Sequence, residues 1–186
     1  MKNRTISLVA IGIAVALISI LQARDSFPWD EQNCPSCDSF GIQRLDKLKA
    51  PSFSLKGLDG KKLALKDIKG NPIILTFWAT WCTPCREELP TLERFAEGKK
   101  DQLTILTMAI DGENKSKVRR FVDENKINLT VLLDEKEQIA RTYRVRMVPT
   151  TILINREGVM IGAIMGQRDW SVPEAWLAIR ELLGLH

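Results

Sequence analysis

The sequence predicts an α/β fold in which helices cover a central sheet, and a short apolar segment precedes this domain. From Ala50 onward, stretches with the pattern of buried strands alternate with amphipathic helical stretches, as in folds with parallel strands. The last two strand-like stretches are separated only by "NREG", which predicts an antiparallel hairpin. A chain of 186 residues with 45% hydrophobic residues is long enough to bury one substantial core.

Residues 1–23 are predicted to form a membrane anchor or signal segment. Residues 5–23 carry no charge, and a helix of this length spans about 28 Å, close to the hydrocarbon thickness of a bilayer. Basic residues precede the segment and acidic residues follow it, so the positive-inside rule places the rest of the chain outside the cytoplasm. Ala23 suits a signal-peptide cleavage site, but Leu21 is too bulky for its third-last position. We therefore favour a single-pass cell-membrane anchor over a cleaved signal peptide.

Residues 24–49 are polar and contain two prolines, so we expect a linker, with the folded domain over 50–186. The stretches "SFSL" and "KKLAL", joined by "KGLDG", predict a hairpin at the start of the domain. The continuous apolar run over 72–79 is typical of a central strand covered on both faces. A helix should follow over 82–97, with Gly98 placed to end it.

The second half of the domain continues the alternation. We expect strands over 103–110 and 129–133, and amphipathic helices over 115–126 and 135–145. The hairpin strands "TTILI" and "VMIGAIM" follow. A helix over 172–184, with a proline near its start, closes the chain.

The pair Cys82 and Cys85 lies where the buried strand passes into a helix. Amide groups and the macrodipole at a helix N-terminus stabilise negative charge, so the Cys82 thiol should have a lowered pKa. Pro84 suits the first helical turn, and Trp81 would give an apolar shoulder to a docking surface. Cys85, one turn on, is placed to attack a mixed disulfide formed at Cys82.

The motif "FWATWCTPCREELP" resembles the active site of the thioredoxin superfamily, in particular its membrane-anchored TlpA/ResA/CcmG-type branch. The resemblance extends from about Ala50 to the C-terminus and includes "VPTTILINREG". It implies a thioredoxin-like fold, a central mixed sheet flanked by helices with an N-terminal β-hairpin extension. It also implies that Cys82 is the exposed nucleophile, Cys85 the buried resolving cysteine, and Pro149 the cis-proline that faces the disulfide. Pro149 would present the backbone of Val148 to an extended substrate.

Glu88 follows Cys85 by three residues, on the adjacent helical turn. In the family branch the matching glutamate is thought to handle protons for the thiols, and a carboxyl group buried near two sulfurs could act as acid or base. The other interpretation is a first-turn glutamate favoured by the helix dipole. Thr76 departs from thioredoxin, which has a buried aspartate there, and this shifts proton handling toward Glu88. We expect Trp170 to serve as a core or surface anchor.

The predicted function is an extracytoplasmic, membrane-tethered thiol-disulfide oxidoreductase without a cofactor. The Thr-Pro pair between Cys82 and Cys85 adds no cation that would stabilise a thiolate, which favours a reductase over a strong oxidant. The resemblance implies disulfide-bearing clients, such as apocytochrome c or copper-site cysteines of an oxidase. It further implies a DsbD/CcdA-type transmembrane electron donor. A thiol oxidase or isomerase of the same fold is the alternative direction.

Other classes of function fit less well. The chain lacks a basic run or a recognition motif, so nucleic-acid binding is not expected. A peroxidase would need a Thr-x-x-Cys arrangement, but Thr80 precedes Cys82 by only two residues. A copper- or zinc-handling module using both CxxC pairs is the remaining alternative. It is disfavoured because 44 residues separate the pairs and the only histidine is the last residue.

The second pair, Cys34 and Cys37, lies in the predicted linker. Three roles stay open: a local structural disulfide, an accessory redox pair that exchanges with Cys82 and Cys85, or part of a metal site. A disulfide closing so short a loop contributes roughly 2 kcal/mol in the chain-entropy model, which is modest for a domain able to fold alone. Our hypothesis is that the pair forms a disulfide and is dispensable for the chemical step at Cys82.

Overall fold

The computed structural model describes residues 34–68 and 70–185. The predicted membrane segment over 1–23 lies outside these ranges, as does the first part of the predicted linker. Within the described ranges, every helix is too short or too polar to cross a bilayer.

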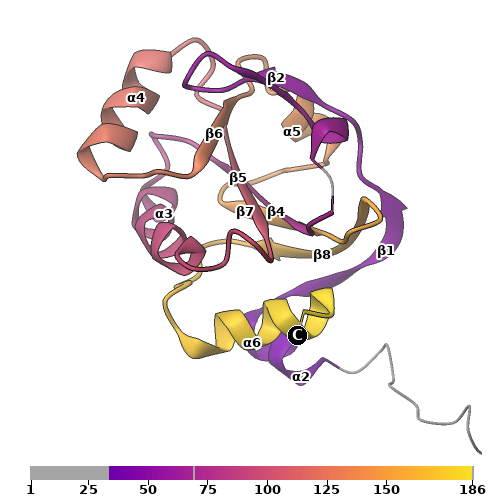
Figure 1. Ribbon diagram of the computed structural model, residues 1–186. Coiled ribbons are helices and arrows are strands. Elements are labelled where there is room, and N and C mark those ends of the chain that lie inside the picture. The colour runs from indigo at the N-terminus through magenta and orange to yellow at the C-terminus, as the bar shows by residue number, and fades with distance from the viewer. Residues whose placement is uncertain (1–33, 69, 186) are drawn as a thin grey trace, which may run out of the picture. The chain divides into compact units, whose positions relative to one another are not determined.

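A six-stranded mixed sheet lies at the centre of the fold, with the strand order β1-β8-β7-β4-β5-β6 (Figure 1). The strands are β1 (Gln43–Lys49), β4 (Ile73–Trp78), β5 (Thr104–Ala109), β6 (Thr130–Leu133), β7 (Thr150–Ile154) and β8 (Val159–Met165). Strand β4 pairs in parallel with β5 and antiparallel with β7. The strands β2 (Ser54–Lys56) and β3 (Lys62–Ala64) form a separate antiparallel hairpin.

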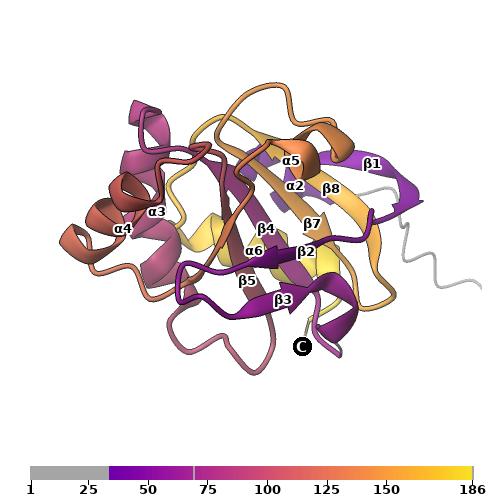
Figure 2. The ribbon, with the colours of Figure 1, turned by 90° about the horizontal axis from the view of Figure 1, so that it is seen from above.

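Helices and the hairpin cover the two faces of this sheet (Figure 2). The helices are α2 (Pro35–Phe40), α3 (Thr83–Ala96), α4 (Lys115–Glu124), α5 (Gln138–Thr142) and α6 (Pro173–Leu183), with a short 3-10 turn at Leu65–Asp67. Side chains from α2, α3, α4 and α6 form one hydrophobic cluster. Side chains from α5 and from the residues around the hairpin form the other cluster.

The central strand β4 explains why the sheet has two covered faces. Ile74 and Trp78 belong to the cluster under α3, whereas Leu75 and Phe77 belong to the opposite cluster. All six residues of β4 are buried. This confirms the central strand predicted from the continuous apolar run, because side chains alternate between the two faces of a strand.

The other elements of the domain also follow the prediction, with one shortened helix. The helix expected over 135–145 spans only Gln138–Thr142. It is bounded by residues with left-handed backbone, Glu137 with φ 52° and Arg144 with φ 57°, which stop the helical hydrogen-bond pattern.

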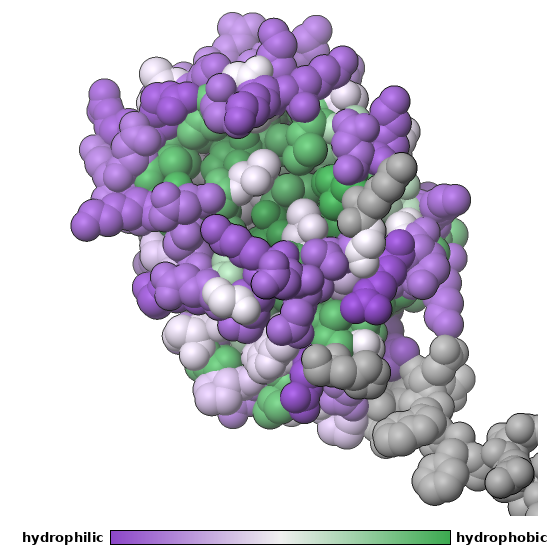
Figure 3. Space-filling model, viewed as in Figure 1, coloured by the Kyte–Doolittle hydropathy of each residue, from purple (hydrophilic) through white to green (hydrophobic). Residues whose placement is uncertain are grey.

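Polar side chains cover most of the rim of the face shown in Figure 3, in agreement with charges spread along the sequence.

The linker predicted over 24–49 is wrong for its second half. This half contains α2 and β1, and β1 is one of the two edge strands of the main sheet, paired with β8. Only Cys37 and Phe40 of α2 are buried, and most side chains of β1 are exposed, so neither element has a clear apolar pattern. Helix α2 lies beside α6 at the other end of the chain (Figure 1).

Candidate active site

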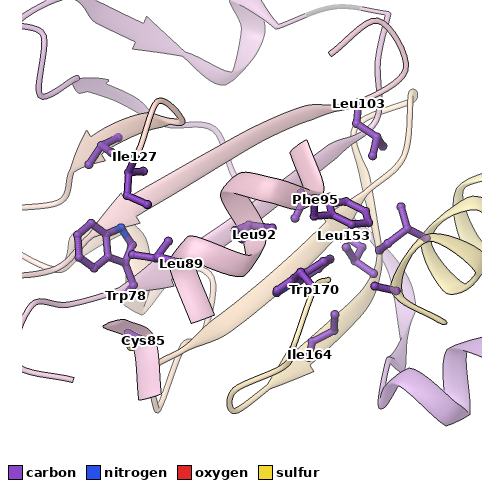
Figure 4. Packing of buried hydrophobic residues seen from close by; sticks show 14 of the residues in the cluster. Trp78, Cys85, Leu89, Leu92, Phe95, Leu103, Ile127, Leu153, Ile164 and Trp170 are labelled. Carbon is purple, nitrogen blue, oxygen red and sulfur yellow. The ribbon is translucent and has the colours of Figure 1, made fainter. Parts of the chain in front are cut away.

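The turn from β4 into α3 places the two cysteines. Cys82 is the N-cap residue of α3, and its Sγ accepts a hydrogen bond from the backbone N–H of Cys85 at 3.2 Å. The helix continues with Leu89, Leu92 and Phe95 in the core, and Figure 4 shows Cys85 at one end of this row. The packed row fixes the helix, so its N-terminus holds the cysteines in a defined position.

Cys82 and Cys85 form a disulfide with a Cα–Cα distance of 5.3 Å. Cys82 is 6% exposed and Cys85 is 0% exposed. The expectation of a buried Cys85 is confirmed, but the expectation of an exposed Cys82 is wrong, because Cys82 also packs into the core cluster and only a small part of it reaches the surface. A client sulfur can therefore approach Cys82 before it could reach Cys85.

A loop from the other side of the sheet closes over the disulfide. The Val148–Pro149 peptide bond is cis, as the resemblance implied. The Val148 carbonyl oxygen lies 3.5 Å from the Cys82 Sγ, and the Pro149 carbonyl accepts a hydrogen bond from the Gly166 N–H at 2.9 Å. The hydrogen bond between Gly166 and Pro149 ties the loop to the end of β8. Since β7 begins directly after Pro149, both strands hold the backbone next to the disulfide.

Glu88 is 1% exposed and lies one helical turn beyond Cys85. Its carboxylate accepts hydrogen bonds from the Trp170 indole Nε1–H at 2.8 Å and from the Arg168 backbone N–H at 3.2 Å. Burial raises the pKa of Glu88 from 4.5 to about 7, and the hydrogen bonds and the Arg168 charge act in the opposite direction. Near neutral pH this carboxyl group can both take up and release a proton.

Thr76 occupies the position at which thioredoxin carries an aspartate. Its hydroxyl is buried and lies 2.8 Å from the hydroxyl of Thr151, the residue opposite it on β7. A pair of hydroxyl groups has no acid–base function at neutral pH. The structure therefore agrees with the expectation that Thr76 does not handle protons.

Trp81 and its neighbours form the outer edge of the site. The Trp81 side chain is 68% exposed, in agreement with the predicted apolar shoulder. The preceding residue, Thr80, donates its backbone N–H to both carboxylate oxygens of Asp111 at 3.0 Å, and its hydroxyl also bonds this carboxylate. Asp111 thus anchors the loop that carries Trp81 and Cys82, a role that the sequence analysis missed.

The second cysteine pair is also a disulfide. Cys34 and Cys37 have a Cα–Cα distance of 5.1 Å, and both are buried in the cluster that contains Cys85. The predicted bond is present, and its role stays a prediction.

Trp170 and Arg168 both donate hydrogen bonds to Glu88, and sequence reasoning missed these contacts. Trp170 is buried in the core as expected, with its ring packed edge-on against Phe95 at 5.1 Å. Its backbone N–H also bonds the Thr91 hydroxyl on α3, so the indole is held against the helix that carries Glu88. A buried tryptophan needs an acceptor for its Nε1–H, and this requirement could have suggested a buried carboxylate partner.

The described part of the chain offers no arranged metal site. Among residues 34–68 and 70–185, no group of three or more His, Cys, Asp or Glu side chains is arranged to hold a metal ion. Both sulfur pairs are oxidised here, and metal ions bind thiolates. The metal-handling alternative would therefore require both pairs to be reduced and to move.

Comparison with known proteins gives a consistent result. Residues 47–162 match the model of the AhpC/TSA family. The chain is 37% identical over 134 residues to the thioredoxin-like protein YneN of Bacillus subtilis, covering 71% of this chain and 77% of YneN. It is 35% identical over 130 residues to the thiol-disulfide oxidoreductase ResA of Bacillus anthracis, covering 69% of this chain and 75% of ResA.

Solved structures agree with these sequence matches. A crystal structure of a protein assigned as the thiol:disulfide interchange protein DsbE, from Chlorobium tepidum, superimposes with a TM-score of 0.68 at 32% identity. The superposition covers 75% of this chain and 99% of that protein. The predicted thioredoxin-like fold with a central mixed sheet is therefore confirmed.

Proposed function

Since the chain belongs to the AhpC/TSA family and is a thioredoxin-like thiol-disulfide oxidoreductase of the ResA and DsbE type, we propose that it reduces disulfides of client proteins outside the cytoplasm. The observation that carries this proposal is the Cys82–Cys85 disulfide at the start of α3, faced by the Val148–Pro149 loop. The buried Glu88 supplies an acid–base group one turn away.

The proposed cycle begins with both sulfurs reduced. The Cys82 thiolate attacks one sulfur of a client disulfide, a mixed disulfide forms, and the other client sulfur leaves as a thiolate that takes up a proton. The Cys85 thiol then loses its proton and attacks the Cys82 sulfur. This closes the Cys82–Cys85 disulfide and releases the second client sulfur. Two electrons pass from the enzyme to the client, which becomes a dithiol.

Glu88 supports the second step in this scheme. Cys85 is fully buried, so water reaches its proton poorly. A carboxylate one turn along the same helix can accept that proton directly or through a water molecule, and its raised pKa lets it return the proton near neutral pH. The Val148 carbonyl stands beside Cys82, where an extended client segment could pair with the loop backbone.

The cellular setting of the proposal comes from the sequence. The uncharged segment over 5–23 would tether the enzyme to the cell membrane with its domain on the extracytoplasmic side. That side is oxidising, so a reductase there needs electrons delivered through the membrane, and a DsbD/CcdA-type donor would supply them. The client class we propose is proteins of cytochrome c or oxidase maturation, whose cysteines must be reduced before they bind their cofactor.

A trapping experiment tests this function. In a Cys85→Ala variant the mixed disulfide on Cys82 cannot be resolved, so clients should accumulate as covalent adducts that reductant releases. A Cys82→Ala/Cys85→Ala variant is the matched control and should trap nothing. Adducts that form equally on both variants would refute the role of Cys82, and adducts made mainly of proteins without disulfides would refute the reductase function.

Oxidation or isomerisation is the second candidate function. A solution structure of a protein assigned as a disulfide isomerase, from Bacteroides thetaiotaomicron, superimposes with a TM-score of 0.63 at 27% identity. The steady-state redox form separates an oxidase, which is kept as a disulfide, from a reductase or an isomerase, which both start from the dithiol. Thiol alkylation in intact cells should label Cys82 and Cys85 if the enzyme is a reductase.

A further inference from the structure

The short helix α2 is attached to the domain at both of its ends. At its start, the Cys34–Cys37 disulfide closes the first turn, and the Cys37 Sγ lies 3.9 Å from the Ala178 carbonyl oxygen of α6. At its end, Phe40 is buried and Gly41 adopts φ 76°, a left-handed conformation that suits glycine at a helix terminus. Helix α2 therefore holds Phe40 in one place.

Phe40 contacts two residues of the loop between β8 and α6. Its ring packs edge-on against the Trp170 ring, with centroids 5.2 Å apart and an interplanar angle of 72°. Its carbonyl oxygen accepts a hydrogen bond from the Arg168 Nε–H at 2.9 Å. A side chain at position 41 would also collide with the Arg168 guanidinium, so the chain passes unusually close to this arginine there.

The same two residues are the hydrogen-bond donors to Glu88. Trp170 donates from its indole and Arg168 from its backbone. The contacts thus form a continuous series from the second disulfide through Phe40 to the carboxylate beside the redox cysteines. Residues 34–40, 168 and 170 all lie outside the 47–162 range that matches the family model.

We propose that α2, closed by the Cys34–Cys37 disulfide, is a positioning element for the active site: through Phe40 it holds Trp170 and Arg168 over Glu88 and keeps water from this carboxyl group. Cys34, Cys37 and Phe40 are positioning residues, since none of them touches the reacting sulfurs. The importance of Glu88 for turnover rests on the proposed function, but its environment in the oxidised protein does not.

The groups around Glu88 fix the sign of the expected effect. The Arg168 guanidinium is the charged group that acts on Glu88, and it lowers the pKa. Cys85, on the same helix as Glu88, is held in a disulfide. The acidic residues of the two neighbouring segments, Asp38 on α2 and Asp169 in the β8–α6 loop, are both exposed, and Asp169 accepts a hydrogen bond from Ser171. Burial is the largest influence and raises the pKa. Loosening the packing of Phe40 against Trp170 should let water reach the carboxyl group and therefore lower the pKa of Glu88.

The test measures the pKa of Glu88 directly by carbon NMR of its carboxyl group, in the oxidised full-length chain in detergent. Phe40→Ala and the double variant Cys34→Ser/Cys37→Ser should each lower this pKa by roughly one pH unit, a tenfold change in the protonation equilibrium. Phe40→Leu, which keeps an apolar cover over Trp170, should restore most of the wild-type value. Asp38→Ala changes an exposed residue of the same helix and should leave the titration unchanged.

A further variant separates the effect of packing over Glu88 from the effect of the Trp170 hydrogen bond to its carboxylate. Trp170→Phe keeps a ring against Phe40 and Phe95 but removes the N–H donor, so it should raise the pKa of Glu88 instead of lowering it. An unchanged or raised pKa in the folded Phe40→Ala variant, or in the disulfide variant, would overturn the proposal.

Turnover gives the second readout. At pH 8.5, where Glu88 is mostly ionised in the wild type and should be so in the disulfide variant, this variant should reduce an insulin-type substrate within about twofold of the wild type. Activity below about a tenth at all pH values would overturn the positioning role and assign the pair to an electron relay. An inactive wild-type protein with the expected NMR shifts would instead count against the proposed function.

Discussion

Replacement of Glu88 by Gln should change how the stability of the protein depends on pH. Glutamine has nearly the same volume, stays neutral at all pH values and still offers a carbonyl oxygen to the Trp170 N–H. The substitution therefore removes the titration and leaves most of the packing. The relevant quantity is the difference in unfolding free energy between wild type and variant, followed as a function of pH.

The sign follows from the protons bound in each state. Glu88 has a pKa of about 7 when folded and 4.5 ordinarily, so between these values the unfolded chain has lost its proton and the folded protein has kept it. The stabilising contribution is fully present below pH 4.5 and is lost as the pH rises through 7. About 2.5 pH units at 1.36 kcal/mol each amount to about 3 kcal/mol for this side chain, which is 1% exposed.

Denaturant unfolding of the oxidised protein from pH 4 to 8.5 measures this quantity, and the disulfides keep the four thiols from titrating. The unfolding free energy of wild type minus that of Glu88→Gln should fall by about 3 kcal/mol across the range. Glu87→Gln removes an exposed carboxylate from the same helix and should follow the wild-type curve. A constant difference between wild type and Glu88→Gln would show that burial does not raise this pKa, and our view of Glu88 would be wrong.

Three further outcomes are expected. Cys82→Ser should abolish insulin-type disulfide reduction, whereas Cys85→Ser should retain a single attack and block release; normal turnover of Cys82→Ser would remove the central claim. Glu88→Gln should slow exchange roughly a hundredfold and remove the inflection of the pH–rate profile near pH 7. An unchanged profile would show that Glu88 only interacts with the helix dipole and transfers no proton. Asp111→Ala leaves two donors of Thr80 unpaired and should lower stability by about 2 kcal/mol in thermal unfolding, an effect that Thr80→Val should partly reproduce.

The core of the fold could be predicted from the sequence because its signals are local. The apolar run over 72–79, the CxxC pair and Gly98 follow one another within one short stretch of the chain, and they mark a buried strand, a helix start and a helix end. Burial on both faces of β4 produces a continuous apolar run regardless of the neighbouring strands. Cys82 and Cys85 could be placed for the same reason.

Helix α2 and strand β1 could not be predicted because their structure depends on distant partners. An edge strand with exposed side chains has no alternating pattern, and its register is set by β8, more than a hundred residues away in the chain. The start and end signals of α2 are nevertheless visible afterwards, with Pro35 in its first turn and Gly41 just past its end. Six residues are too few for helical periodicity to show.

Glu88, the proton-handling group that we propose, illustrates the same limit within the active site. At the strand position that carries an aspartate in thioredoxin, the Thr76 hydroxyl pairs with Thr151, so the carboxyl group that can serve the thiols comes from α3 instead. Position along the helix could be predicted for Glu88, but its environment could not. That environment is made by donors 80 and 82 residues further along the chain, and one of these is packed against Phe40, near the other end of the domain. The cysteines are thus specified by one short motif, whereas the acidity of Glu88 depends on contacts between both ends of the described fold.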